Sequence, residues 1–277
     1  MTRTPNIDAE AFKAFEHQGW VEVASHYHDA FASLTKQTVE PLLDRAGVRS
    51  GSYVLDVASG TGHVAAAAAT RGARVLGIDF SATMVTAARR LHPDLEFREG
   101  DAEALPIEDR SVDAVTMNFG LLHLARPEQA IAEAFRVLKP GGRFAFTVWA
   151  MPEHALAFQI VLGAIERHGK PDVPIPPGPP FFRFSDADES KRALASAGFR
   201  GAAVELVPMR WRLNNPDAVF DAFWEGGVRT RAVLRAQETQ ALVAIRSAIR
   251  TAVELHPVDH GYELPMASVL ASAERPS

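Results

Sequence analysis

Short apolar runs alternate with helix-like patterns through the middle of the chain. Runs rich in Val, Leu, Ile and Phe are typical of buried strands, and they lie at 52–57, 74–79, 95–99, 112–117 and 143–149. Between them, apolar residues recur at helical spacing over 62–71, 81–91 and 127–138. This alternation predicts a parallel sheet with helices on both faces. Ser81 suits a helix N-cap, Pro127 a first helical position, and Gly141 a helix end.

The flanking segments predict a more varied set of elements. Apolar spacing predicts helices within 8–46, before the first strand. Later in the chain it predicts helices at 153–168, 186–197, 216–225 and 228–255, and strands at 202–212 and 261–273. The proline-rich run 171–180 must be extended. Four arginines on the predicted helix 228–255 indicate a solvent-exposed face: Arg231, Arg235, Arg246 and Arg250.

Composition narrows the class of protein. A chain of 277 residues can bury a full core and suits one elaborated α/β domain. The net charge of −5 argues against a general nucleic-acid binder. The chain has no cysteine, which excludes disulfides and thiolate metal sites. Its first residues are polar and its longest apolar stretch, 64–69, is too short to cross a bilayer, so we expect a cytoplasmic protein without a membrane span.

A glycine-rich turn follows the first predicted strand. Its sequence is Asp56-Val57-Ala58-Ser59-Gly60-Thr61-Gly62, and an alanine-rich helix comes next. Glycines let a backbone approach a ligand closely, as in nucleotide-binding turns between a strand and a helix. A carboxylate at the end of that strand repels a pyrophosphate and attracts a cationic amino acid. S-adenosylmethionine carries an ammonium and a sulfonium and no phosphate, so the turn favours this ligand.

The same turn also satisfies a dinucleotide-binding fingerprint. G-x-G-x-x-A at 60–65 fits the pattern, and Asp79 lies near the position of a ribose-binding acid. Three further features favour S-adenosylmethionine. Asp79 ends the second strand, where it can accept hydrogen bonds from both ribose hydroxyls, and Asp101 follows the third strand, where an adenine amino group can donate to it. The run 138–142, Leu-Lys-Pro-Gly-Gly, then separates a predicted helix from the next strand.

These motifs, in this order, resemble those of the class I S-adenosylmethionine-dependent methyltransferases, most closely the ubiquinone- and menaquinone-biosynthesis type. The resemblance is good over roughly 20–150. It implies a Rossmann-like α/β fold, with a seven-stranded, mostly parallel sheet, helices on both faces, an antiparallel last strand and a helical cap. The chain would form one methyltransferase domain, comprising a lid at 1–46, a cofactor-binding core at 47–150, cap insertions at 151–185 and 213–260, and sheet-completing segments at 186–212 and 261–277.

The resemblance also implies which residues hold the cofactor. The contacts that it assigns are Trp20, Tyr27, Asp56, Ala58, Ser59, Gly60, Gly62, Asp79, Phe80, Met84, Gly100, Asp101, Ala102 and Asn118. The turn would hold the methionine portion, Asp79 the ribose and Asp101 the adenine edge. Plainer interpretations stay open: the two acids as caps of helices or turns, Met84 as core, and the Trp20–Tyr27 segment as an ordinary amphipathic helix.

Methyl transfer is an in-line displacement, so the protein has mainly to align donor and acceptor and to exclude water. The candidate catalytic residues are His123, just past the fourth strand, and His26 and Tyr27 in the lid, where His28 is a further candidate. An acceptor that is already nucleophilic would need no base. The segment Met117-Asn118-Phe119-Gly120 has no clustered acids, so we expect no catalytic metal.

Aromatic residues in and near the predicted cap suggest a pocket for a small apolar or aromatic molecule: Trp149, Phe181, Phe182, Phe184, Trp211, Phe220, Phe223 and Trp224. Alternatively, they fill the cap's own core. Arg183 would pair with an acidic group of the substrate or act as a solvated tether. The predicted function is metal-free methyl transfer to a small molecule. A nicotinamide-dependent oxidoreductase and a non-catalytic S-adenosylmethionine-binding protein are the alternatives, and a homo-oligomer is compatible with the sequence.

Overall fold

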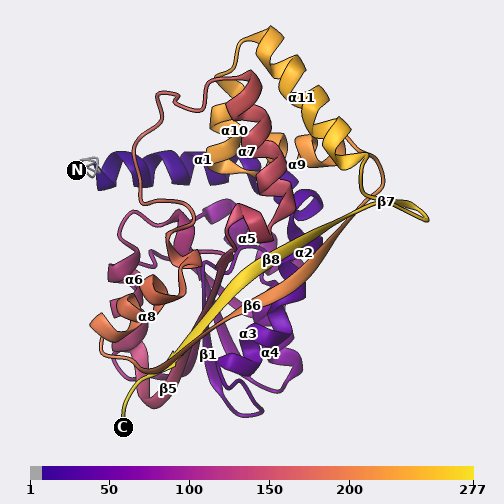
Figure 1. Cartoon of the computed structure of the whole chain (residues 1–277). Coiled ribbons are helices and arrows are strands. Elements are labelled where there is room, and N and C mark those ends of the chain that lie inside the picture. The colour runs from indigo at the N-terminus through magenta and orange to yellow at the C-terminus, as the bar shows by residue number, and fades with distance from the viewer. Residues whose placement is uncertain (1–7) are drawn as a thin grey trace. The chain divides into compact units, whose positions relative to one another are not determined.

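The alternating strands and helices form an open sheet in the computed structural model, which describes residues 8–277 except for the side chains of 24–30. Five parallel strands come from this pattern: β1 (Tyr53–Val57), β2 (Arg74–Asp79), β3 (Glu96–Glu99), β4 (Val112–Asn118) and β5 (Leu138–Trp149). Their spatial order is β3-β2-β1-β4-β5 (Figure 1). The order changes direction between β1 and β4, which is where ligands bind in open α/β sheets.

The last strand runs against its neighbour, as predicted. β8 (Gly261–Glu274) pairs with β5 in antiparallel register, with Glu274 opposite Arg143 and Ser268 opposite Trp149. β6 (Arg200–Leu213) lies beyond β8 at the edge of the sheet, and a two-residue strand, β7 (Pro257–Val258), pairs with the start of β8. The predicted fold class, a Rossmann-like and mostly parallel sheet, is confirmed, with the short β7 as an addition.

Helices cover both faces of this sheet. On one face, α3 (Val39–Arg45), α4 (His63–Thr70) and α5 (Ala82–Leu91) share an apolar core with β1, β2 and β4. The other face carries α6 (Pro127–Val137) and α8 (Ala187–Ser196). There Phe199, just after α8, packs against Phe144 of β5 and Phe135 of α6, with ring centroids 5.8 and 5.1 Å apart. Ala145 belongs to the opposite core because side chains alternate along a strand.

The chain divides into two compact units. The sheet unit comprises 35–149, 178–207 and 268–277, and the helical unit comprises 8–34, 150–177 and 208–267 of the described residues. The helices of the second unit include α1 (Ala9–Ala30), α7 (Leu156–His168), α9 (Ala218–Gly226), α10 (Val228–Arg235) and α11 (Thr239–Val253). The predicted lid, core and cap segments stay a prediction. In the described part of the chain, no helix combines the length and the apolar character that a membrane span needs.

Aromatic residues of the helical unit pack mainly on one another. The Phe223 ring lies 5.3 Å from Phe31 and 5.0 Å from Phe158, both edge-to-face, and Phe31 lies 5.5 Å from Trp211. Such pairs stabilise a core beyond the area that they bury. For these residues the alternative interpretation, that they fill the core of their own unit, is therefore confirmed.

Several local predictions differ from the structure. The helix predicted to end at 138 ends at Val137, so Gly141 lies within β5, with φ of 78°, and does not end a helix. The helix predicted at 228–255 is interrupted at 236–238 and forms α10 and α11. The four arginines therefore do not share one solvent-exposed face. Arg231 pairs with Glu22 and its side chain is only 12% exposed, because it packs against α1.

The two predicted helix starts, at Ser81 and at Pro127, are confirmed. The Ser81 hydroxyl accepts a hydrogen bond from the amide of Met84 in the first turn of α5, and Pro127 occupies the first turn of α6. Both helices therefore begin where local chemistry predicts. α5 follows β2 and helps to fix where that strand ends. α6 precedes β5 and helps to fix where that strand begins.

Candidate cofactor-binding site

The turn between β1 and α4 is built from residues in left-handed backbone conformations. Ala58, Gly60 and Gly62 have φ of 54°, 52° and 85°. A side chain at Gly62 would come within 2.6 Å of the Phe97 ring, whereas one at Gly60 would meet nothing within 4 Å. Gly62 therefore packs against the protein, and Gly60 faces open space. Ala58 has the strained backbone that is common at functional sites.

Asp56 lies beneath this turn and is buried, with 1% of its surface exposed. Its carboxylate accepts hydrogen bonds from the Thr116 hydroxyl (3.0 Å) and from the Ala65 amide (3.2 Å) in the first turn of α4. Burial raises the pKa of Asp56 to about 7. The side chain thus ties β1, β4 and α4 together. A direct contact between Asp56 and the methionine portion of a ligand stays a prediction.

Asp79, at the end of β2, joins the second strand to the turn. One carboxylate oxygen accepts a hydrogen bond from the Gly60 amide (2.8 Å), and the other accepts one from the Ser81 amide (2.9 Å). The predicted capping role is therefore present. A contact between Asp79 and ribose hydroxyls stays a prediction. Phe80 follows Asp79 and is half-buried.

Ser59 has a polar group that is available for a ligand. It is 9% exposed, and its hydroxyl has no hydrogen-bond partner among the described residues. Its amide, by contrast, donates to the carbonyl of Ile78 in β2 (3.0 Å). A buried hydroxyl without a partner is costly, so this atom suits a bound polar group.

The end of β3 adds the residues predicted to face adenine. Gly100 donates its amide to the carbonyl of Asp79 (3.0 Å), which brings Asp101 and Ala102 beside the end of β2. Asp101 accepts a hydrogen bond from the Glu103 amide (2.9 Å) and so fixes the first turn of the loop. Met84 is 2% exposed in α5, which matches the alternative that it belongs to the core.

Asn118, at the end of β4, spends most of its hydrogen-bonding capacity within the protein. Its side-chain oxygen accepts hydrogen bonds from the hydroxyls of Thr147 (2.5 Å) and Thr38 (2.8 Å), and its nitrogen donates to the carbonyl of Thr35 (3.1 Å). One N–H of the amide is left for a ligand. The next residue, Phe119, has φ of 54°, so a second strained turn follows β4.

His123 lies beside aromatic side chains of the sheet unit. It ends a short 3-10 helix (Leu121–His123), and its ring meets that of Phe181 edge-to-face, at 6.2 Å. Phe181 in turn packs edge-to-face on Phe182, at 5.0 Å. Arg183 does not lie free beside them. It forms ion pairs with Glu128 (2.5 Å) and Glu189 (2.6 Å), which contradicts both roles predicted for it.

The remaining predicted residues belong to the N-terminal segment of the chain. Trp20 lies on α1 in the helical unit, and its lid role stays a prediction. The side chains of His26, Tyr27 and His28 lie outside the described residues. No group of three or more potential metal ligands occurs in 8–23 and 31–277.

Three buried threonines that bond to Asp56 and Asn118 were not predicted from the sequence. Thr116, Thr38 and Thr147 are buried hydroxyls that bond to Asp56 and Asn118. No spacing rule identifies them, because their partners lie 29 to 80 residues away in the chain. Glu133 and Arg136 also interact with the loop after β3, and their i,i+3 spacing on a predicted helix was a visible signal.

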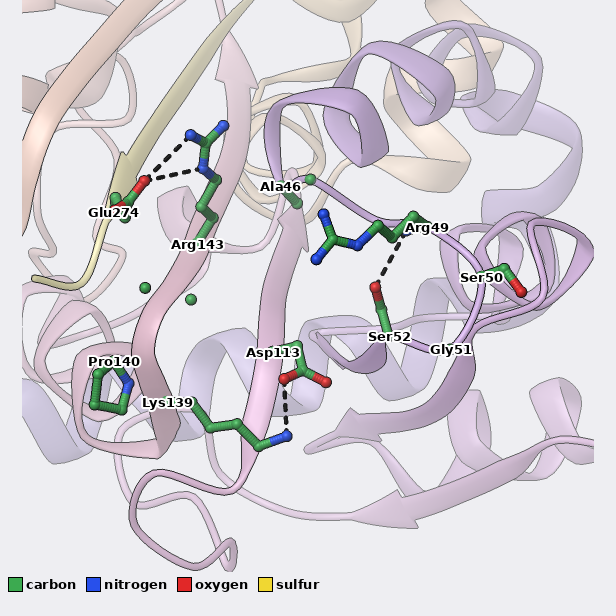
Figure 2. A pocket seen from close by; sticks show the side chains of 13 residues that line it. Ala46, Arg49, Ser50, Gly51, Ser52, Asp113, Lys139, Pro140, Arg143 and Glu274 are labelled. Carbon is green, nitrogen blue, oxygen red and sulfur yellow. Dashed lines mark hydrogen bonds and ion pairs between the residues drawn. The ribbon is translucent and has the colours of Figure 1, made fainter. Parts of the chain in front are cut away.

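A separate groove of about 730 Å³ lies at the opposite edge of the sheet, where the parallel strands begin (Figure 2). Its charged residues are largely paired with one another. Lys139 bonds to Asp113 (2.8 Å), and Arg143 to Glu274 (3.2 Å). None of the predicted cofactor contacts lines this groove. The candidate site is therefore at the carboxyl ends of β1, β2, β3 and β4.

A Rossmann-like sheet with a glycine turn after β1 and carboxylates after β2 and β3 defines a nucleoside-binding α/β protein. Residues 55–146 match the family described as "Methyltransferase domain". The resemblance of this segment to class I S-adenosylmethionine-dependent methyltransferases of the ubiquinone/menaquinone type is thereby confirmed.

Individual relatives agree with this family. A demethylmenaquinone methyltransferase from Renibacterium salmoninarum is 43% identical over 111 residues, which are 40% of this chain and 47% of the relative. The chain thus spans about half the length of the curated relatives that it matches. Among solved structures, phosphoethanolamine N-methyltransferase 2 from Haemonchus contortus has a TM-score of 0.58 at 17% identity, covering 96% of this chain and 60% of that one. The YcgJ protein of Bacillus subtilis has a TM-score of 0.57 at 18% identity, covering 87% and 98%. These two likenesses support the fold.

Proposed function

We propose that the protein transfers a methyl group from S-adenosylmethionine to a small apolar or aromatic molecule. The observation that carries this proposal is the 2.8 Å hydrogen bond from the Gly60 amide to the Asp79 carboxylate. It holds the Asp79 carboxylate against the first glycine of the turn. Asp56 in addition occupies the Ala65 amide in the first turn of α4, which is where a diphosphate would bind. A cationic nucleoside without phosphate suits this arrangement, and a dinucleotide does not.

The residues present fit the proposed cofactor. The Ser59 hydroxyl is buried without a partner among the described residues, and Gly60 faces open space, so the turn can take the methionine portion. Asp79 ends β2 beside the turn, where the ribose would lie, and Asp101 follows β3, where the adenine edge would lie. When bound, S-adenosylmethionine supplies an electrophilic methyl group on its sulfonium.

We propose an acceptor with an apolar ring, methylated in the absence of a metal. Support comes from the aromatic side chains around His123 and from relatives named for demethylmenaquinone. His123 would accept the proton that leaves the acceptor, while Phe181 and Phe182 exclude water. We also propose that the protein is cytoplasmic.

Calorimetry with S-adenosylhomocysteine and with NAD tests the proposal. We expect S-adenosylhomocysteine to bind in a one-to-one complex and NAD to give no measurable heat. Mass spectrometry then detects a gain of one methyl group on members of a panel that contains demethylated quinones and phenols, with polar amines as the comparison. Tight binding of NAD with no binding of S-adenosylhomocysteine refutes the proposal. Binding without turnover on any ring-containing acceptor leaves a non-catalytic binding protein.

A further inference from the structure

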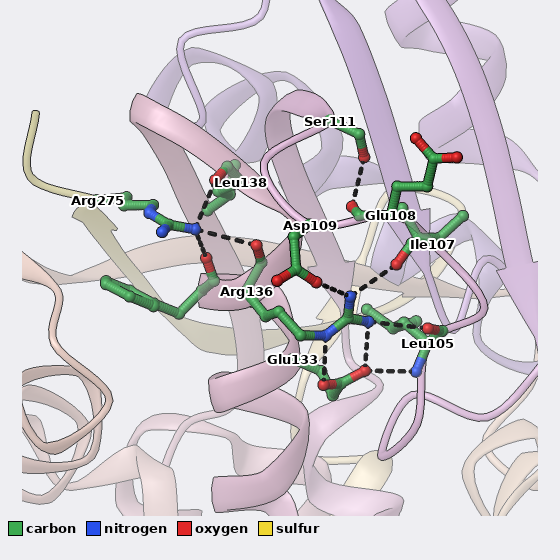
Figure 3. Close-up of polar contacts among 10 residues, drawn as sticks. Leu105, Ile107, Glu108, Asp109, Ser111, Glu133, Arg136, Leu138 and Arg275 are labelled. Carbon is green, nitrogen blue, oxygen red and sulfur yellow. Dashed lines mark hydrogen bonds and ion pairs between the residues drawn. The ribbon is translucent and has the colours of Figure 1, made fainter.

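Arg136, near the end of α6, directs all of its N–H groups into one small network (Figure 3). Nε and Nη2 donate to the two carboxylate oxygens of Glu133, each at 2.8 Å. Nη1 donates to the carbonyl of Ile107 (2.7 Å) and to Asp109 (2.6 Å), and Nη2 also donates to the carbonyl of Leu105 (2.9 Å). A guanidinium has five N–H donors in a fixed plane, and here each has an acceptor.

Glu133 completes this contact from the acceptor side. The same carboxylate accepts a hydrogen bond from the Leu105 amide at 2.7 Å, so Leu105 is bound through both its N–H and its C=O. Glu133 is 12% exposed and Leu105 5% exposed, so water competes little for these bonds. Its hydrogen bonds with Arg136 lower the pKa of Glu133, which keeps the carboxylate ionised. The middle of the loop between β3 and β4 is thereby fixed to the end of α6.

The start of the same loop is fixed to the other end of α6. Glu103 is 6% exposed, and its carboxylate accepts a hydrogen bond from the amide of Arg126, the N-cap residue of that helix, at 2.8 Å. A second oxygen of Glu103 lies 3.3 Å from the Arg126 guanidinium. A carboxylate at a helix N-terminus is also favoured by the helix dipole. One helix therefore holds the loop at two points.

The residues predicted to meet adenine lie directly before these two anchors. Asp101 bonds to the Glu103 amide at 2.9 Å and forms an isolated bridge with Ala104, so the position of its carboxylate depends on 103–105. Ordering a free loop costs conformational entropy, so a loop that is fixed beforehand spares the ligand this cost. A misplaced Asp101 would lose its hydrogen bond to the adenine amino group.

We propose that Glu133 and Arg136 are positioning residues for adenine recognition, acting through 101–105. This inference rests on the proposed function, because it needs a bound adenosyl group. It assigns selectivity for the base to two side chains that do not touch the ligand. Their loss should weaken discrimination between bases more than it weakens binding of the rest of the cofactor.

The test compares two ligands that differ only in the base. S-adenosylhomocysteine has an amino group at C6 of the base, and S-inosylhomocysteine has a carbonyl oxygen there, which Asp101 would repel. We expect the unaltered protein to prefer the adenosyl ligand by about 10- to 100-fold, which is the value of one hydrogen bond to a charged group. For Arg136→Lys and for Glu133→Gln, affinity for the adenosyl ligand should fall about 10-fold and the preference should shrink to a few-fold.

The variants are chosen so that folding and positioning can be separated. Arg136→Lys keeps the charge but cannot serve five acceptors, and Glu133→Gln keeps the size of the side chain. The matched control is Arg98→Gln on β3, whose side chain is 51% exposed and pairs with Glu96 outside the network. The control should keep the full preference, and thermal unfolding shows whether each variant is folded.

Two outcomes overturn the inference, and a third contradicts the proposed function. An equal loss of affinity for both ligands, with the preference unchanged, overturns the inference, because the network would then only stabilise the fold. Equal affinities of the unaltered protein for the two ligands also overturn it, since Asp101 would not read the base. Absence of binding to either ligand in the unaltered protein contradicts the proposed function instead.

Discussion

Replacement of Asp56 by Asn should change how stability depends on pH. Asp56 is buried, and burial raises the pKa of its carboxyl from the usual 3.8 to about 7. The folded protein therefore holds a proton there at pH values at which the unfolded chain has released it. Asn keeps the shape: its oxygen can accept a hydrogen bond from the Ala65 amide, and its N–H can donate to the Thr116 hydroxyl oxygen.

The direction is opposite to that of most acidic residues, because this pKa is raised by folding. The stabilisation is complete below the unfolded pKa of about 4, and it is lost as the pH rises towards about 7. Each unit of pH within this window costs about 1.4 kcal/mol. Between pH 5 and pH 8, the unaltered protein should lose about 2.5 kcal/mol relative to Asp56→Asn.

Urea unfolding of both proteins at intervals from pH 5 to pH 8 measures this difference, because other titrating groups cancel when the two curves are subtracted. Asp113→Asn is the control, and its difference curve should stay flat from pH 5 to pH 8. Burial raises the pKa of Asp113, but its bonds with Lys139 and the Tyr53 amide outweigh burial, so its pKa lies below 3.8. Its stabilisation is lost only as the pH falls below about 4. A flat difference curve for Asp56→Asn would refute the burial argument.

Three further predictions concern single contacts. Gly62→Ala should destabilise the protein by about 2–4 kcal/mol in urea unfolding, because its φ is 85° and the Phe97 ring blocks the new methyl group. Gly51→Ala, with φ of 82° and open space around it, should cost about 1–2 kcal/mol. Equal costs would show that the Phe97 ring moves aside. Arg275→Gln should lower the unfolding free energy by about 2–3 kcal/mol, because Nη1 donates to three carbonyls at the end of α6 (Figure 3). Arg143→Gln, in a half-exposed ion pair, should cost less than about 1 kcal/mol. A similar small cost for both variants would show that Arg275 does not stabilise the end of α6. Asp79→Asn should weaken S-adenosylhomocysteine binding by about 1.5–3 kcal/mol in calorimetry, and unchanged affinity would mean that the ribose lies elsewhere.

The central strands could be predicted from the sequence because β1, β2 and β4 are apolar and buried along most of their length. Runs such as 52–57 and 74–79 stand out from their polar surroundings, and the observed strands begin and end within one or two residues of them. The break at 236–238 could not be predicted, since both halves of 228–255 keep helical spacing across it. The start of β5 at Leu138 was missed for a related reason, because this apolar residue also fits the last turn of α6.

The candidate site was predictable only where its residues follow strand ends. Asp79 and Asp101 were placed by this rule, and the structure links them through the Gly100 amide. The pairing of Arg183 with Glu128 was not predictable, because only the fold brings α6 beside the segment that precedes α8. Sequence spacing finds the backbone of a site, and packing decides which side chains remain available to a ligand.

The acidic residues of the turn disfavour a dinucleotide in a different way from the one that the sequence predicts. The sequence suggested that Asp56 attracts a cation directly, but in the structure this side chain is buried and raised in pKa, and it bonds to the first turn of α4. Its bond to the Ala65 amide fills a donor in the first turn of α4, where a diphosphate-binding turn needs free donors. Asp79 fills the Gly60 amide at the start of the turn. The turn therefore disfavours a dinucleotide because its own acids already fill the anion site, and this holds whether or not Asp56 ever touches the ligand.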